Sequence, residues 1–156
     1  MNEELIVLES MSAASEFIAQ EGILSKMKET RNNKKRQKLE AKGVKVFSKD
    51  EFAQDVQPKI DKCIDDIFKD IDKMKDPNVK EFLSDSYVYR KGKVQQGGRD
   101  ISFILINYDQ VSDMEEYYDI VTDISDILYK HAKKCGFQVD NNGIELSIEI
   151  PFTQII

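Results

Sequence analysis

The sequence has few of the residues from which catalytic and metal sites are usually built. Its 156 residues include two cysteines and one histidine. Cys63 and Cys135 lie far apart along the chain and match no zinc-binding or redox spacing. We therefore expect two free thiols in a reducing compartment, and no metal site.

His131 is the one histidine that could act as a general base. It lies beside Lys130, Lys133 and Lys134 near the end of a predicted helix, where cations complement the helix dipole. A partly exposed, dipole-complementing side chain is the simpler interpretation. The alternative is a general base that works without a second histidine or a nearby nucleophile. Because so few candidate groups are present, we predict that the chain has no catalytic residue, binds no cofactor and is not an enzyme.

Long hydrophobic runs are also missing. The longest, from Ile101 to Ile106, is far too short to cross a bilayer. Glu3 and Glu4 stand where a secretory signal peptide needs positive charge. We therefore expect a cytoplasmic protein that does not enter a membrane.

The overall charge limits the choice of partners. With 23 basic and 29 acidic side chains the formal net charge is -6, which argues against binding nucleic acid or anionic lipid over the whole surface. A local basic patch remains compatible with this balance. Charged residues make up 33% of the chain and hydrophobic residues 40%, a balance that fits long helices with one solvated face.

Residues 26–42 form a segment that we name the basic arm. Eight lysines and arginines against two glutamates leave this segment a local charge of +6. Past Met27 its only apolar residues are Leu39 and Ala41, so the arm cannot bury a face, although its residues favour helix. The candidate contact residues are Lys28, Arg31, Lys34, Lys35, Arg36 and Lys38.

Three interpretations of the basic arm stay open. It could be a solvated helix, it could neutralise the phosphates of a nucleic acid, or it could dock on an acidic surface of a protein partner. The arm carries no interleaved aromatic residue, so base stacking is not supported.

A second basic group surrounds the glycine-rich stretch from Lys91 to Gly98, which we expect to be a hairpin loop. No Gly-Lys-Ser/Thr follows, so the stretch does not match a phosphate-binding P-loop. The loop could contact phosphates or be a solvated turn. Its candidate contacts are Arg90, Lys91, Lys93 and Arg99.

An acidic surface is predicted on the helix that follows Ser112. Its members share one helical stripe away from the apolar one: Glu116, Asp119, Asp123 and Asp126. Carboxylates on one straight helix do not wrap a cation, so a metal site is disfavoured. The stripe could be a solvated face or an interface for a basic partner, including the basic arm of another copy.

The N-terminal half is predicted to be helical. An apolar stripe over Leu8, Met11, Ser15 and Ile18 indicates the first helix, and Gly43 is a plausible stop. Ser48 and Glu51 form a capping box for the second helix, in which Pro58 predicts a kink or restart near Gln57. Asp76 and Pro77 begin a short third helix.

The C-terminal half alternates strands with one helix. Two strands precede the helix, which is predicted to begin with a second capping box at Ser112 and Glu115 and to end at Gly136. Two more strands flank a tight turn at Asn141-Asn142-Gly143, and Pro151 stops the last. The apolar tail 151–156 should pack on the core or enter a neighbouring molecule.

The predicted fold class is α+β: two long N-terminal helices followed by a β-β-α-β-β unit that forms a largely antiparallel four-stranded sheet. The helix within this unit should cover one face of the sheet, and the second long helix could cover the other. We expect two regions, an N-terminal helix with the basic arm at 1–43 and an α+β domain at 44–156.

The functional hypothesis is a non-enzymatic protein that assembles with itself or with a larger complex. Small α+β domains with helical arms and apolar tails are a common plan among viral assembly and connector proteins, which is an analogy of architecture. The alternative is an accessory factor that binds nucleic acid through the basic arm.

Overall fold

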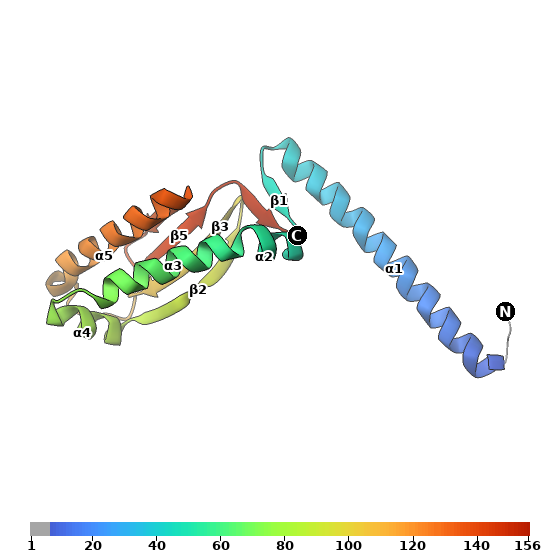
Figure 1. Cartoon of the computed structure of the whole chain (residues 1–156), viewed down its shortest axis with the longest axis horizontal. Helices are drawn as coiled ribbons and strands as arrows, with labels where there is room; N and C mark the ends of the chain where they lie inside the picture. Colours follow the sequence, from blue (N-terminus) through green and yellow to red (C-terminus); the bar gives the residue numbers. More distant parts are fainter. Residues whose placement is uncertain (1–6) are drawn as a thin grey trace. The chain divides into compact units, whose positions relative to one another are not determined.

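The computed structural model describes residues 7–156, with side chains from Ile23 onward. The chain divides into two units between Lys42 and Gly43. The described part of the first unit is one helix, α1 (Val7–Ala41), and the second unit holds the strands and the remaining helices (Figure 1). The stripe predicted from Leu8 to Ile18 lies outside the described side chains.

The second predicted helix is divided in two. α2 (Lys49–Asp55) begins at the predicted capping box, in which Ser48 Oγ accepts from the Glu51 amide at 3.1 Å and Glu51 Oε1 accepts from the Ser48 amide at 2.7 Å. α3 (Gln57–Asp72) begins after Val56 with Pro58 in its first turn, where a missing N–H costs no helical bond. The predicted restart near Gln57 is confirmed, and the expectation of two long N-terminal helices is not supported.

Two further helices follow. α4 (Pro77–Asp85) is capped by Asp76, whose Oδ1 accepts from the Asn78 amide at 2.9 Å. α5 (Met114–Cys135) ends at Gly136, as predicted, in a left-handed conformation with φ of +77°. None of the helices described between residues 7 and 156 has the length and apolar character needed to span a bilayer.

The predicted capping box of α5 is wrong. The N-cap is Asp113, which adopts a left-handed conformation with φ of +58° and makes no side-chain capping bond. The helix therefore begins one residue later than predicted. This shift places Glu115 at the second helical position instead of the third, from which a capping box would form.

Four strands form an antiparallel sheet with the order β2-β3-β5-β4: β2 (Tyr87–Gly97), β3 (Asp100–Asn107), β5 (Glu145–Ile150) and β4 (Gln138–Asn141). α5 connects β3 to β4, so the predicted β-β-α-β-β order and the four-stranded antiparallel sheet are confirmed.

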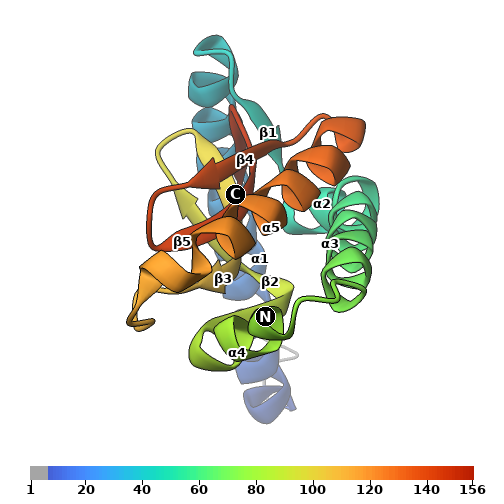
Figure 2. The ribbon, with the colours of Figure 1, turned by 90° about the vertical axis from the view of Figure 1, so that its left-hand side faces the viewer.

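α3 and α5 lie side by side on the same face of this sheet (Figures 1 and 2). Their apolar sides and the inward residues of β3 and β5 form one core, which includes Ile60, Ile64 and Ile67 of α3, Ile120, Ile124 and Leu128 of α5, and Phe103, Leu146 and Ile148 of the sheet. The expectation that the second helix covers the opposite face is therefore wrong. Both helices carry an apolar stripe, and one shared core buries both.

β2 runs through most of the predicted hairpin loop, so that prediction is also wrong. Val88 pairs with Ile106 and Lys93 pairs with Ile104, which leaves residues 89–92 bulged opposite a single residue of β3. Gly92 lies in this bulge with φ of +78°, and a Cβ there would stand 2.9 Å from Ile64 Cδ1. Gly92 lies in the bulge and Gly98 lies in a tight turn at residues 98–99, so the stretch does not form a long loop.

The C-terminal tail packs on its own domain. β6 (Thr153–Ile155) pairs in parallel with β1 (Lys45–Phe47). The side-chain amide of Gln96 makes two hydrogen bonds to the backbone of Ile155, as a neighbouring strand would. Its Oε1 accepts from the Ile155 amide at 2.9 Å, and its Nε2 donates to the Ile155 carbonyl at 3.2 Å. Of the two expected fates of the tail, packing on its own core is the one observed.

Candidate interaction surfaces

In the described part of α1, most cationic side chains lie on one side of the helix. The helical period places five exposed cations on one side, which we name the basic face: Lys28, Arg31, Lys34, Lys35 and Lys38. Glu29 and Glu40 fall on the opposite side, and Arg36 lies away from the basic face. Five of the six predicted contact residues of the arm therefore lie on one side of the helix, and Lys42 lies in the turn that follows it.

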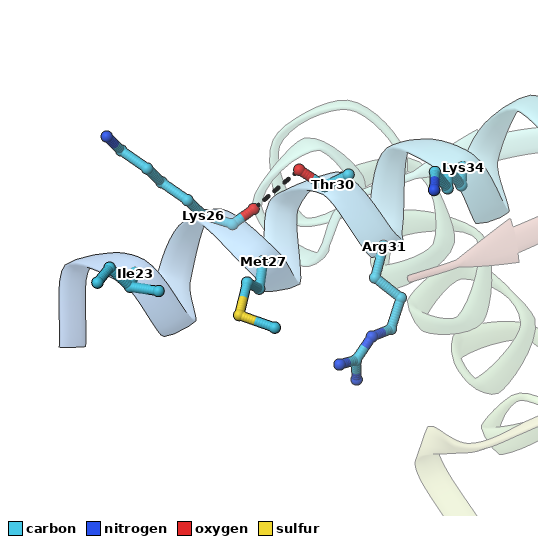
Figure 3. A pocket seen from close by; sticks show the side chains of 6 residues that line it. All are labelled: Ile23, Lys26, Met27, Thr30, Arg31 and Lys34. Atoms are coloured by element: carbon cyan, nitrogen blue, oxygen red, sulfur yellow. Dashed lines mark hydrogen bonds between the residues drawn. The ribbon is translucent and has the colours of Figure 1, made fainter. Parts of the chain in front are cut away.

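An apolar group extends the basic face toward the N-terminus. Ile23, Leu24 and Met27 are 58%, 64% and 54% exposed. Figure 3 shows Met27 and Arg31 pointing to the same side of the helix, while Thr30 Oγ1 donates to the Lys26 carbonyl at 3.0 Å. The hollow drawn there is lined by α1 residues alone. One helix cannot enclose a small molecule, so this surface suits the side of another macromolecule.

The second predicted basic group is not a free cationic surface. The Arg90 guanidinium donates to both carboxylate oxygens of Asp72 in α3, at 3.0 Å each, and lies 5.0 Å from the centroid of the Phe68 ring. Hydrogen bonding to Asp72 raises the pKa of Arg90. Arg90 therefore fastens β2 to α3.

The other three cations of this group are dispersed. Lys93 Nζ lies 5.6 Å from the centroid of the Tyr89 ring. Lys91 lines a hollow together with Asp61, Lys62 and Asp65 of α3. Arg99 is exposed in the β2–β3 turn. The structure does not gather these side chains into one phosphate-binding surface.

The acidic stripe of α5 lies entirely on the exposed side of its helix. Glu116, Asp119, Asp123 and Asp126 are all exposed, whereas the opposite side of α5 is buried in the core. Tyr118 and Tyr129, which are 71% and 60% exposed, both fall to one side of the stripe by the helical period. Exposed tyrosines beside a charged surface are typical of protein–protein interfaces.

His131 makes a contact that the sequence analysis did not predict. Its side chain is only 12% exposed, and its Nε2 lies 2.7 Å from Asp70 Oδ2 in α3. The hydrogen bond from His131 is the first cause of a lowered Asp70 pKa, with the nearby charges of His131, Lys130 and Lys73 adding to it. Sequence reasoning missed this pair because its members are 61 positions apart.

The described residues hold no group of three or more His, Cys, Asp or Glu side chains that could bind a metal ion. The absence of enzymatic activity stays a prediction. What the geometry does offer is an exposed basic and apolar surface on α1 and an exposed acidic surface on α5. Comparison of the chain with protein-family models, with curated proteins and with solved structures finds no match in any of the three.

Proposed function

We propose that this chain is a non-enzymatic assembly protein in which the basic face of α1 docks on the acidic stripe of α5 in a second copy. The observation that supports the proposal most is the opposite charge of these two exposed helix surfaces. Each copy offers one surface of each kind, so the contact is head-to-tail. Such a contact closes into a ring or continues as a filament, depending on the rotation between copies.

Exposed apolar residues beside the charges would add a contribution to the binding free energy that does not depend on salt. Exposed ion pairs contribute at most about 1 kcal/mol each and weaken as salt rises. Ile23, Leu24 and Met27 on one surface and Tyr118 and Tyr129 on the other give each surface exposed apolar area. Burying this area would provide the salt-independent part of the binding free energy.

Charge reversal on each side tests the proposal. One variant carries Lys34→Glu, Lys35→Glu and Lys38→Glu, and the other carries Asp119→Lys, Asp123→Lys and Asp126→Lys. Mass photometry and sedimentation velocity should show oligomers of the unchanged protein that dissociate as salt is added. Each variant alone should be mainly monomeric. An equimolar mixture should associate again, because each reversed surface then meets its complement in the other variant.

A control variant separates a local effect from a change in net charge. Lys49→Glu, Lys59→Glu and Lys75→Glu change the net charge equally but lie outside α1. This control should assemble as the unchanged protein does. A monomer at high concentration and low salt, or a mixture that stays monomeric, would contradict the proposal.

The alternative function is an accessory factor that binds nucleic acid. The observation that favours it is the gathering of five cations on one side of one helix, which can follow a phosphate backbone. Fluorescence anisotropy with duplex DNA and single-stranded RNA should then show affinity that falls steeply with salt and is lost in the Lys34, Lys35 and Lys38 variant. Absence of binding at low salt would exclude this function.

A further inference from the structure

A hollow of about 370 Å³ opens beside α5, next to the turn that joins β4 to β5. Its lining includes Met114, Tyr118, Val121 and Thr122 of α5, Tyr108 after β3, and Asn141 at the end of β4. Val121 and Tyr108 are buried, at 7% and 4% exposed, whereas Tyr118 is 71% exposed. The hollow therefore combines a buried part with an exposed aromatic edge.

The hydroxyl groups of the buried part already have partners. Tyr108 Oη donates to Asn141 Oδ1 at 2.6 Å, and the same oxygen accepts from the Gly143 amide at 3.1 Å. Thr122 Oγ1 donates to the Tyr118 carbonyl at 3.0 Å. Because a buried polar group needs a hydrogen-bond partner, the hollow suits an apolar side chain better than a charged ligand.

The hollow borders the acidic stripe of α5. The helical period places Tyr118 between the buried Val121 on one side and the exposed Asp119 on the other. An occupant of the hollow therefore has carboxylates beside it. This arrangement favours an apolar group that is carried next to positive charge.

Met27 of α1 has these properties. It is 54% exposed, and the helical period places it within the basic face, ahead of Arg31 and Lys34 along the helix. Figure 3 shows Met27 and Arg31 on the same side of α1. A rise of 1.5 Å per residue separates Met27 from Lys34 by roughly 10 Å, which is about the width of one helix. The cations could therefore reach the stripe across α5 from a methionine seated in the hollow.

We propose that the hollow beside Tyr118 receives Met27 of α1 from a second copy, an inference that rests on the assembly proposed above. The flexible, polarizable thioether packs well against an aromatic ring such as that of Tyr118. Because the hollow lies beside the stripe and the cations follow Met27 along α1, the two helices cross obliquely. Charges alone would allow the helices to slide past each other, so this seat would fix the register between copies.

Photochemical cross-linking tests the contact directly. One chain carries p-benzoylphenylalanine in place of Tyr118 and is mixed with isotope-labelled unchanged protein. Irradiation should join it to the labelled peptide that contains Met27, as identified by mass spectrometry. Cross-links confined to one chain, or made to any other segment of the labelled copy, would overturn the inference.

Association constants from sedimentation velocity provide a second test. Met27→Ala and Tyr118→Ala should each weaken association by roughly tenfold, because each removes apolar area from the contact. The salt dependence should stay that of the unchanged protein, since no charge is lost. The double variant should associate about as weakly as either single variant, because the two side chains act together. Tyr87→Ala is the matched control: Tyr87 is 59% exposed in β2, and its loss should leave association unchanged.

These measurements separate the seat of Met27 from the assembly itself. A monomeric unchanged protein would contradict both. The charge-reversal variants could instead behave as expected while Met27→Ala and Tyr118→Ala associate as tightly as Tyr87→Ala. The assembly would then stand, and the proposed role of the hollow would be wrong.

Discussion

His131 Nε2 in α5 lies 2.7 Å from Asp70 Oδ2 in α3, and this contact joins the two helices that cover the sheet. The His131 side chain is 12% exposed and that of Asp70 is 29% exposed. Lys130 Nζ adds a longer contact to the same carboxylate oxygen at 3.6 Å. The Asp70 carboxylate of α3 therefore contacts both His131 and Lys130 of α5. These contacts help to set the position of α3 against α5.

Acid should weaken the fold through Asp70. Its pKa is lowered in the folded protein, first by the hydrogen bond from His131, so the ionised carboxylate stabilises the fold at pH values above about 4, its usual pKa. This contribution is lost as the pH falls through the folded-state pKa. Urea unfolding between pH 2 and pH 7 should show a smaller loss of stability on acidification in Asp70→Asn than in the unchanged protein.

The matched control for Asp70 lies on the same helix. Asp65 Oδ2 is 3.1 Å from Lys69 Nζ, and both side chains are about two-thirds exposed at 66% and 65%. Because exposed pairs contribute little, Asp65→Asn should leave the pH dependence almost unchanged. Equal pH profiles for Asp70→Asn and the unchanged protein would show that the contact between α3 and α5 does not affect acid stability.

Gly92 should not tolerate a side chain. Its φ is +78°, and a Cβ would lie 2.9 Å from Ile64 Cδ1 and 3.3 Å from Phe103 Cβ. Strain in the left-handed conformation and crowding of the core together predict that Gly92→Ala lowers the free energy of unfolding by roughly 1–3 kcal/mol. Chemical denaturation measures this change.

Gly97 in the same strand provides the control for Gly92. A Cβ at this position meets nothing within 4 Å. Gly97→Ala should therefore change stability by less than about 0.5 kcal/mol. If both alanine variants had the same stability, the close approach of β2 to α3 at the bulge would not constrain residue 92.

Gln96 should hold the C-terminal strand in place. Its amide makes two hydrogen bonds to the backbone of Ile155, and both are lost in Gln96→Ala. The expected cost is about 1 kcal/mol, which corresponds to a roughly fivefold faster exchange of the Ile155 amide hydrogen. Hydrogen exchange followed by mass spectrometry detects this change. Gln95→Ala, at the exposed neighbouring position, should leave exchange in the tail unaltered, and equal exchange in both variants would contradict the role of Gln96.

Arg90 should contribute to stability more than its lysine neighbour does. Arg90→Ala removes the two hydrogen bonds to Asp72 and the packing over Phe68, so it should cost about 1 kcal/mol. Lys91→Ala should cost less than about half of that, because exposed charges contribute little. Urea denaturation compares the two, and a Lys91→Ala effect as large as that of Arg90→Ala would contradict the assignment.

Local chemistry explains which features of the fold were predictable. The capping box of Ser48, the N-cap of Asp76 and the left-handed Gly136 depend on residues within one helical turn, and all three are confirmed. The capping box at Ser112 was wrong because Asp113 adopts a left-handed conformation, which nothing in the local sequence pattern indicates. The bulge at Gly92 was missed because it depends on how β2 meets α3 and β3.

The candidate surfaces, like the fold, were predictable only where they depend on residues close together in the sequence. The acidic stripe of α5 was predicted from helical spacing, whereas the basic arm was predicted as a segment and its one-sided face was recognised only with the extent of α1. The hydrogen bonds from Arg90 to Asp72 and between His131 and Asp70 depend on contacts between elements, which no local spacing encodes.

The sequence by itself determined the order of the elements, the apolar stripes of α3 and α5 and the placement of opposite charges on two helices, because periodicity and capping act over a few residues. Only the tertiary structure decided that α3 and α5 share one face of the sheet, that His131 is hydrogen-bonded to Asp70 and that the tail returns to β1. The physical reason is that one apolar core can be buried only by bringing together segments that are far apart along the chain, and the packing of that core sets which polar groups become neighbours.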